Sequence, residues 1–473
     1  MKKHIHFIGI CGVAMSALAI AFKKAGYTVS GSDVGFYPPV STMLEKSGVT
    51  FYPGWHPEKM LASNLMGTVP DLVIVGNVAS STNPEWLAVQ TKKIPYQSYP
   101  EAIAEFFVKE KSIVCAGTYG KTTTTALLAW IFSELKLKSS YMFGGLATGE
   151  FPSAALVDSD WSILEGDEYK SARWDNGPKF AHYNAKYLLL TSVNWDHADV
   201  YPTEASYFEA FEKLVASIPA DGMIVVSTDN KNALDSTTKV VDGPLVVTYG
   251  KDSDAMYCYK NVTQSDAGLN FEIHYQEKNI SITCPLLGLY QAENITGAFA
   301  MANELLRQPE KIAAAIATFP GLKRRLEKRS EGPTPAGVTV FDDIAHSPTK
   351  AKYVLETLRK IYTGKIIAVF EPNTGNRKSE SLPQYDHAFA AADEVVIPRL
   401  TKVKIDVDDL NPPFDGEELA ETIGKTHTHV NYIDDDKKLV HHLISRTKKN
   451  DIIVFLGSHG FRGMIEELIS KLK

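Results

Sequence analysis

Short apolar runs rich in β-branched residues alternate along the chain with stretches of helical periodicity. Alternation of this kind predicts parallel sheets whose faces are covered by helices. We therefore expect an α/β protein. The runs with the pattern of buried strands are residues 4–10, 28–32, 72–75, 112–116, 161–164, 187–193, 338–341, 366–370, 394–397 and 452–456.

The same pattern divides the chain into blocks. A chain of 473 residues predicts about three domains, and a charged break at residues 109–111 precedes the first strand of the central block. Residues 223–284 are richer in short strands and turn residues, which predicts a mixed sheet attached to the central one. We expect domains at residues 1–107, 108–322 and 323–473.

Composition and charge narrow the function classes. Hydrophobic residues make up 44% of the chain and charged residues 22%, which is typical of folded globular domains and argues against disorder. The net charge of -7 argues against a surface that tracks a phosphate backbone, so we expect no nucleic-acid partner. The four cysteines lie far apart without a C-x-x-C pair, which excludes a zinc knuckle or a disulfide framework and favours a reducing cytoplasm.

The apolar N-terminal stretch superficially resembles a secretory signal. His4, His6, Gly9 and Gly12 interrupt it, so a strand, a glycine turn and a helix explain it better. No apolar run approaches the roughly 18 residues that a membrane span needs. We expect a cytoplasmic protein without a membrane partner.

A glycine-rich loop connects the apolar run 112–116 to the helical stretch 124–135. A phosphate-binding loop needs this order, because glycines let backbone N–H groups turn toward phosphates, while Lys and Thr reach the terminal phosphate and Mg²⁺. Cys115 stands where the usual motif has glycine, so the loop is a shortened variant. The alternative is a glycine turn with an exposed lysine. The loop consists of Gly117, Thr118, Tyr119, Gly120, Lys121, Thr122 and Thr123.

A second glycine turn follows the first apolar run. It contains Gly9 and Gly12, and Asp33 ends the next strand 21 residues after Gly12. An acid at this position of a Rossmann-like unit binds a sugar hydroxyl, so the turn predicts a site for a nucleotide or a nucleotide sugar. Because the turn lacks the third glycine of G-x-G-x-x-G, a nicotinamide cofactor is a weaker inference. A turn that needs glycine only for close packing is the remaining alternative.

Acidic residues follow two strands downstream of the phosphate loop. Glu165 ends the run 161–164, and Asp196 and His197 follow the run 187–193. Carboxylates at strand ends beside a phosphate loop hold Mg²⁺. Although a lone histidine beside an acid is more often structural, the two strand ends together predict two Mg²⁺ ions around a triphosphate.

The third block contributes a basic cluster at residues 323–329 and an acidic turn at residues 342–348. The acidic turn follows a strand, at the edge where open α/β sheets bind ligands. An arginine of the basic cluster would meet the transferred phosphate. The alternatives are a solvated helix face for the cluster and an ordinary turn before Pro348.

In this order, the segments resemble the Mur ligase family of ATP-dependent amide-forming enzymes over essentially the whole chain. The resemblance implies a Rossmann-like N-terminal domain, a central P-loop ATPase domain and a Rossmann-like C-terminal domain. It also implies ATP and Mg²⁺ as cofactors, and UDP-N-acetylmuramate and a murein peptide as substrates joined through an acyl phosphate. The protein would be a monomer or a weak dimer.

The resemblance further implies a role for each motif residue. Asn294 would contact adenine, Arg325 the γ-phosphate and Asp343 the ribose of ATP. Lys121, Glu165, His197 and Arg325 would be catalytic, and Thr122, Glu165 and His197 would hold Mg²⁺. The ATP site would consist of Gly117, Thr118, Gly120, Lys121, Thr122, Thr123, Asn294, Arg325, Asp343 and His346. The UDP part of the substrate would bind Gly9, Gly12, Met15, Ser16, Asp33 and Asn77.

The branch of the family that resembles the chain best attaches the tripeptide L-alanyl-γ-D-glutamyl-meso-diaminopimelate to UDP-N-acetylmuramate in peptidoglycan recycling. The neighbouring branch adds a single L-alanine to the same nucleotide. A regulatory protein that binds a muramyl precursor without turnover is a third reading. It is kept open by departures from the family pattern at Tyr119, Lys170, Ser347 and Asn373.

Overall fold

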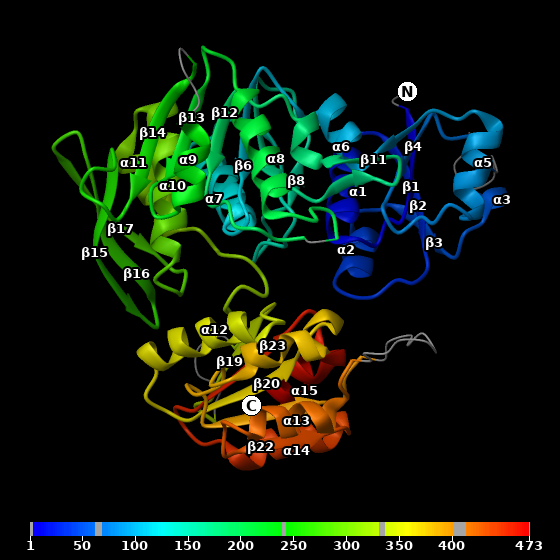
Figure 1. Ribbon diagram of the computed structural model, residues 1–473. Coiled ribbons are helices and arrows are strands. Elements are labelled where there is room, and N and C mark those ends of the chain that lie inside the picture. Colours follow the sequence, from blue (N-terminus) through cyan, green and yellow to red (C-terminus); the bar gives the residue numbers. More distant parts are fainter. Residues whose placement is uncertain are drawn as a thin grey trace. The chain divides into compact units, whose positions relative to one another are not determined.

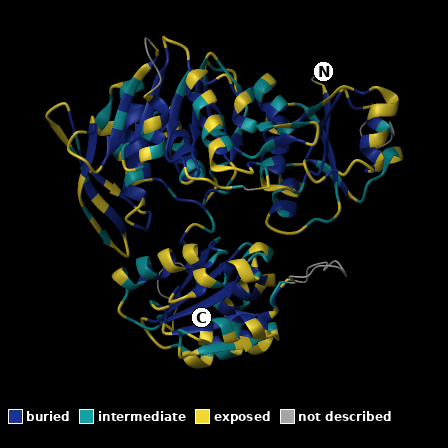
Figure 2. Ribbon diagram, viewed as in Figure 1, coloured by how far each residue is buried: buried dark blue, intermediate teal, exposed yellow. Residues whose placement is uncertain are grey.

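The computed structural model describes residues 3–61, 69–197, 199–238, 243–330, 336–401 and 413–472. Its chain forms two compact units (Figure 1). The first comprises Met1–Val262, Asn270–Cys284 and Tyr290–Pro320, and the second comprises Thr263–Leu269, Pro285–Leu289 and Gly321–Lys473. Within each unit most strand residues are buried, and many exposed residues lie on the helices (Figure 2).

The first unit contains a five-stranded sheet of order β3-β2-β1-β4-β5, in which each neighbouring pair is parallel. The strand order reverses between β1 and β4, and parallel sheets bind ligands at such a point. The strands are β1 (His4–Ile8), β2 (Thr28–Asp33), β3 (Thr50–Pro53), β4 (Leu72–Val75) and β5 (Tyr96–Ser98). The helices are α1 (Val13–Lys24), α2 (Val40–Lys46), α3 (Pro57–Leu61), α5 (Pro84–Lys92), α6 (Tyr99–Ala102) and η1 (Ile103–Phe107).

The same unit contains a ten-stranded sheet of order β17-β16-β15-β14-β13-β12-β6-β9-β7-β8. Strand β6 pairs in parallel with β12 and β9, whereas β7 and β8 are antiparallel. The strands of residues 223–284 continue this sheet, as expected of a segment attached to the central one, and the described pairs β13–β14 and β14–β15 are parallel. The strands are β6 (Lys111–Ala116), β7 (Ser140–Met142), β8 (Ala154–Ala155), β9 (Trp161–Gly166), β12 (Tyr187–Leu190), β13 (Met223–Ser227), β14 (Leu245–Gly250), β15 (Tyr257–Ser265), β16 (Gly268–Tyr275) and β17 (Lys278–Cys284).

Helices cover both faces of the ten-stranded sheet. Leu188 and Leu190 of β12 share an apolar cluster with Phe211 of α8 (Glu204–Ala216). Because alternate strand residues point to opposite faces, Leu189 points away from α8. The remaining helices are α7 (Lys121–Glu134), α9 (Lys231–Thr237), α10 (Gln291–Leu306) and α11 (Pro309–Ala317), of which α7, α10 and α11 pack against one another.

A short antiparallel hairpin connects the two sheets of the first unit. It consists of β10 (Lys170–Ala172) and β11 (Asp175–Pro178), and η2 (Lys179–His182) follows it. Trp174, between the two strands, stacks on Trp86 of α5 with a centroid distance of 5.1 Å and an interplanar angle of 11°. The side-chain amide of Asn77 donates a hydrogen bond of 3.4 Å to the carbonyl of Lys170. The hairpin is thus anchored on the five-stranded sheet.

The second unit contains a six-stranded sheet of order β18-β19-β23-β20-β21-β22. Its pairs are parallel except β18 with β19. The strands are β18 (Glu327–Lys328), β19 (Thr339–Asp343), β20 (Ile366–Glu371), β21 (Glu394–Pro398), β22 (Val430–Ile433) and β23 (Ile452–Gly457). The helices are α12 (Pro348–Ile361), η3 (Thr374–Arg377), η4 (Ser379–Tyr385), α13 (Gly416–Gly424), α14 (Asp436–Arg446), η5 (Phe461–Gly463) and α15 (Met464–Lys471).

The predicted strands are confirmed, with shifted ends. The first strand ends at Ile8, because Gly9 has a φ of +86° that a strand does not accommodate. The strand predicted at 187–193 ends at Leu190. The alternative of a solvated helix for residues 323–329 is wrong, since this segment contains β18. The predicted domain boundaries stay predictions. Ala198, which follows His197 in the predicted metal segment, lies outside the described residues.

Within the described ranges, no helix is long and apolar enough to cross a membrane.

Candidate active site

The glycine loop after β6 has the backbone geometry that a phosphate site needs. Gly117 has a φ of +138°, and Gly120 has a φ of +84° where it caps α7. A Cβ atom at Gly117 would lie 2.2 Å from the Thr191 hydroxyl, and one at Gly120 would lie 2.3 Å from the Asn294 side-chain oxygen. Each of the two positions therefore accommodates only glycine. Thr118 fixes the loop by donating a hydrogen bond of 2.8 Å to the carbonyl of Asn194.

Lys121, the first residue of α7, forms an ion pair with Glu168, whose side chain is 1% exposed. The Lys121 Nζ lies 2.8 Å from Glu168 Oε2, and the His197 Nε2 lies 3.4 Å from Glu168 Oε1. The hydrogen bond to Glu168 is the largest influence that raises the pKa of His197. Glu168 therefore joins two predicted catalytic side chains. Sequence reasoning did not assign it a role, although it lies three residues after Glu165 in the same acidic segment.

Thr122 and Glu165 meet as expected for a magnesium site. The Thr122 hydroxyl donates a hydrogen bond of 2.7 Å to Glu165 Oε1, and the Gly144 N–H donates one of 2.6 Å to Oε2. Burial raises the pKa of Glu165, which these hydrogen bonds partly offset. Hydroxyl and carboxylate oxygens fit Mg²⁺.

In the part of the chain that the structure describes, no three His, Cys, Asp or Glu side chains are arranged to hold a metal. A magnesium ion bound by Thr122 and Glu165 would therefore take its other ligands from phosphate and water. This is the usual arrangement of Mg²⁺ in phosphoryl-transfer sites.

The first glycine turn also requires glycine. A Cβ atom at Gly9 would lie 2.5 Å from the Val78 side chain. Asp33 shapes this turn, because its carboxylate accepts hydrogen bonds of 2.7 Å from the N–H groups of Cys11 and Val34. Ser16 is 1% exposed and donates a hydrogen bond of 3.0 Å to the carbonyl of Val13. These contacts give Asp33 and Ser16 structural partners within the turn.

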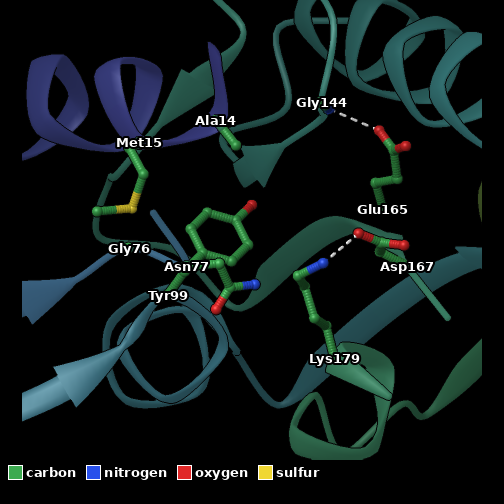
Figure 3. Close-up of a pocket in the computed structure, with 9 residues that line it drawn as sticks. All are labelled: Ala14, Met15, Gly76, Asn77, Tyr99, Gly144, Glu165, Asp167 and Lys179. Carbon is green, nitrogen blue, oxygen red and sulfur yellow. Dashed lines mark hydrogen bonds and ion pairs between the residues drawn. The ribbon is translucent and has the colours of Figure 1, made fainter. Parts of the chain in front are cut away.

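A cavity of about 200 Å³ lies between the first turn of α1 and the segment at the end of β9 (Figure 3). Met15 and Asn77, two predicted substrate residues, line one part, and Glu165 lines the other. Burial raises the pKa of Tyr99, which lies in the cavity between these groups. Gly12, the N-cap of α1, precedes the lining residues Ala14 and Met15. The full lining is Ala14, Met15, Gly76, Asn77, Tyr99, Gly144, Glu165, Asp167 and Lys179.

Asn294, the predicted adenine contact, lies beside Gly120 of the phosphate loop. It is 9% exposed, and its amide donates a hydrogen bond of 2.9 Å to the Gln291 side chain on the same helix. Thr123 is buried in the first turn of α7. The structure thus gathers around one loop all the ATP residues predicted in the first unit.

Three further predicted residues gather at the end of β19 in the second unit. The Asp343 carboxylate accepts hydrogen bonds of 2.6 Å from the Leu326 N–H and 2.8 Å from the Ala345 N–H. Burial raises the pKa of Asp343, and the charge of Arg325 partly offsets this effect. Burial lowers the pKa of His346, and Arg325 contributes to that decrease. Arg325 itself is exposed.

The fold and the candidate site together indicate the class of enzyme to which the protein belongs. A phosphate loop whose Thr122 bonds to Glu165, a carboxylate that lines one cavity with Met15 and Asn77, fits an ATP-dependent carbon–nitrogen ligase. Three family models match the chain: the Mur ligase family catalytic domain over residues 4–110, the Mur ligase middle domain over residues 115–302 and the Mur ligase glutamate ligase domain over residues 324–459. The chain belongs to the Mur ligase family.

Curated relatives match the chain at full length. The UDP-N-acetylmuramate–L-alanyl-γ-D-glutamyl-meso-2,6-diaminoheptandioate ligase of Haemophilus influenzae is 30% identical over 100% of this chain and 99% of its own length. The Escherichia coli ligase of the same name is 32% identical over 99% of this chain and 98% of its own length. A UDP-N-acetylmuramate–L-alanine ligase of Rhodopseudomonas palustris is 30% identical over 83% and 82%. The crystal structure of a murein peptide ligase from Psychrobacter arcticus aligns with a TM-score of 0.70 at 25% identity, over 99% and 98%.

Proposed function

We propose that this protein joins UDP-N-acetylmuramate to L-alanyl-γ-D-glutamyl-meso-diaminopimelate at the expense of ATP, in peptidoglycan recycling. The observation that carries the proposal is the cavity that Met15 and Asn77, predicted substrate residues, line together with Glu165, the predicted magnesium ligand. It gives a bound nucleotide sugar a path to the phosphate that it must receive. Similarity over the full length of two relatives named for this reaction supports the tripeptide as the amine substrate.

The proposed reaction has two steps. A carboxylate oxygen of the lactyl group attacks the γ-phosphorus of ATP, so a P–O bond forms to the acceptor and the bond to ADP breaks. The peptide amine then attacks the acyl carbon, phosphate leaves and the nitrogen loses its proton. Both steps depend on placing the reactants and neutralising charge.

The side chains divide this work. Lys121 would release Glu168 and contact the phosphates of ATP, while the N–H groups of the loop bind them. Mg²⁺ held by Thr122 and Glu165 would neutralise charge on the β- and γ-phosphates. His197 would support a second ion once Lys121 has left Glu168. Asn294 would bind adenine, and Arg325 and Asp343 would contribute from the second unit.

An L-alanine ligase is the second candidate, favoured by the relatives of that name at 30% identity over 83% of the chain. Phosphate release from ATP with UDP-N-acetylmuramate and Mg²⁺ distinguishes the two when each amine is supplied separately and the product mass is determined. Coupling of the tripeptide supports the first proposal, and preference for L-alanine supports the second. Binding of the nucleotide sugar without coupling of either amine would point to a regulatory protein.

The variant Lys121→Ala tests the ATP site itself. Loss of the ammonium group should abolish ATP-dependent coupling in a variant that still folds, although the unpaired Glu168 carboxylate should lower the thermal unfolding midpoint. Normal turnover in a folded variant would contradict the proposed role of the loop.

We further propose that the protein acts in the cytoplasm as a monomer or a weak dimer. Sedimentation in an analytical ultracentrifuge would give the molecular mass and so test the oligomeric state.

A further inference from the structure

Lys179 is a positively charged residue to which the proposed reaction assigns no role. It begins η2, directly after the hairpin that is anchored on the five-stranded sheet. Its Nζ lies 2.5 Å from Asp167 Oδ2 and 5.4 Å from the centre of the Tyr169 ring, and its side chain is 13% exposed. Among the described residues that line the cavity, Lys179 is the one with a cationic side chain.

The charges in the cavity make such a cation necessary. Glu165 and Asp167 both line it, and an acceptor that reacts through a carboxylate brings a third anion. Like charges that are close together in a partly buried site repel strongly unless a cation lies between them. Lys121 belongs to the phosphate loop and, unlike Lys179, does not line the cavity. Lys179 is therefore the counter-ion available to the acceptor.

We propose that Lys179 binds the reacting carboxylate of the acceptor and holds it for attack on the γ-phosphate. This inference rests on the proposed function and assigns a positioning and binding residue to it. In the free protein Asp167 is the partner of Lys179, and the acceptor carboxylate replaces it.

The geometry supports this exchange. Asp167 keeps a second hydrogen bond, of 3.0 Å from the Tyr169 N–H, so it remains in place when Lys179 changes partners. Figure 3 shows the Lys179 side chain extending from η2 toward Asp167, across the cavity from Met15. Glu165 lines the same cavity and bonds to Thr122, so a carboxylate held at Lys179 lies beside the magnesium residues.

A pair of nucleotide sugars separates carboxylate recognition from other binding. UDP-N-acetylmuramate carries the lactyl carboxylate, and UDP-N-acetylglucosamine lacks it but keeps the nucleotide and the sugar. We would measure the dissociation constant of each by isothermal titration calorimetry with the full-length wild type and with Lys179→Met, Lys179→Arg and Lys170→Met. Lys170→Met is the matched control, because Lys170 belongs to the hairpin that precedes Lys179 and does not line the cavity.

Wild type should bind UDP-N-acetylmuramate more tightly than UDP-N-acetylglucosamine. In Lys179→Met this preference should fall about 10-fold to 100-fold, the value of a hydrogen bond to a charged group, while UDP-N-acetylglucosamine binding stays unchanged. Lys179→Arg should restore most of the preference, and Lys170→Met should keep all of it.

Three results would overturn the inference while leaving the proposed function intact. They are an unchanged preference in Lys179→Met, an equal loss of affinity for both sugars, and a wild type that binds both equally. A wild type that binds neither sugar would instead contradict the proposed function. Thermal unfolding midpoints of all variants show whether a loss of binding reflects a loss of folding.

Discussion

Glu168 shows how much of a site depends on a residue that no motif marks. Lys121, Thr122 and Glu165 could be predicted, because a phosphate loop and the strand next to it have recognisable sequences. The role of Glu168 depends on its burial between Lys121 and His197, which only the tertiary structure shows.

The Glu168 contact predicts a change in the titration of His197. The variant Glu168→Gln removes the negative charge that favours the imidazolium form, so the pKa of His197 should fall. Titration of the histidine resonances by NMR would measure it. His182, whose partner is Asp175, is the internal control and should titrate as before. An unchanged pKa of His197 would show that Glu168 does not contact it in solution.

Glu85, fully buried in α5, predicts a pH-dependent contribution to stability. Burial raises the pKa of Glu85, but interactions with His6, Ser32 and Tyr52 outweigh burial and lower it below 4.5. Its contribution is complete above the unfolded-chain pKa and disappears as the pH falls through the lower folded value. Glu85→Gln should therefore reduce the free energy of unfolding by about 1–3 kcal/mol at pH 7, and by less below pH 4.5.

Urea unfolding at both pH values would measure this difference. Glu58→Gln is the control, because the Glu58 side chain is 71% exposed. A loss for Glu85→Gln that did not shrink in acid would contradict the assignment of an ionised, stabilising carboxylate.

At the scale of elements, the strands were predictable and the β10–β11 hairpin was not. Most strands are continuous apolar runs, whereas β10 and β11 consist of Lys170–Ala172 and Asp175–Pro178 and have no apolar alternation. The hairpin is instead fixed by the contact between Trp174 and Trp86, which are far apart in the sequence.

This stack predicts a selective effect on the acceptor. Because the hairpin leads directly to Lys179, Trp174→Ala should raise the KM for UDP-N-acetylmuramate roughly threefold to tenfold, corresponding to the free energy of one aromatic pair. The KM for ATP should not change. Initial-rate kinetics would measure both, with Leu87→Ala as the control on the exposed part of α5. An equal rise in both KM values would indicate a general loss of structure.

At the scale of the whole molecule, the alternation of strands and helices predicted the three sheets. It did not predict that the first two share one compact unit. That union comes from contacts of α1 with β7 and β8 and from a common apolar cluster. Contacts between residues so distant in the sequence leave no local pattern.

The proposed roles of residues in the first and second units predict that binding and turnover can be separated. UDP-N-acetylmuramate binds residues of the first unit in our proposal, whereas Arg325 belongs to the second. Arg325→Ala should lower kcat by about 10³-fold or more, the range for arginines that stabilise a transferred phosphoryl group. Its dissociation constant for UDP-N-acetylmuramate should remain within about twofold of wild type. Calorimetry and phosphate release would measure the two effects, with the exposed Arg307→Ala as the control.

The two lysine–carboxylate pairs, Lys121 with Glu168 and Lys179 with Asp167, have a consequence for the sequence of binding events. Each lysine already has an anion, so an arriving phosphate or carboxylate exchanges with that anion. The exchange leaves Glu168 and Asp167 without their lysines and makes the site more attractive to cations. In the proposed reaction a peptide amine would arrive as an ammonium ion and would lose its proton before it attacks. We therefore expect a compulsory order of addition, in which both anionic substrates bind first and the amine binds last.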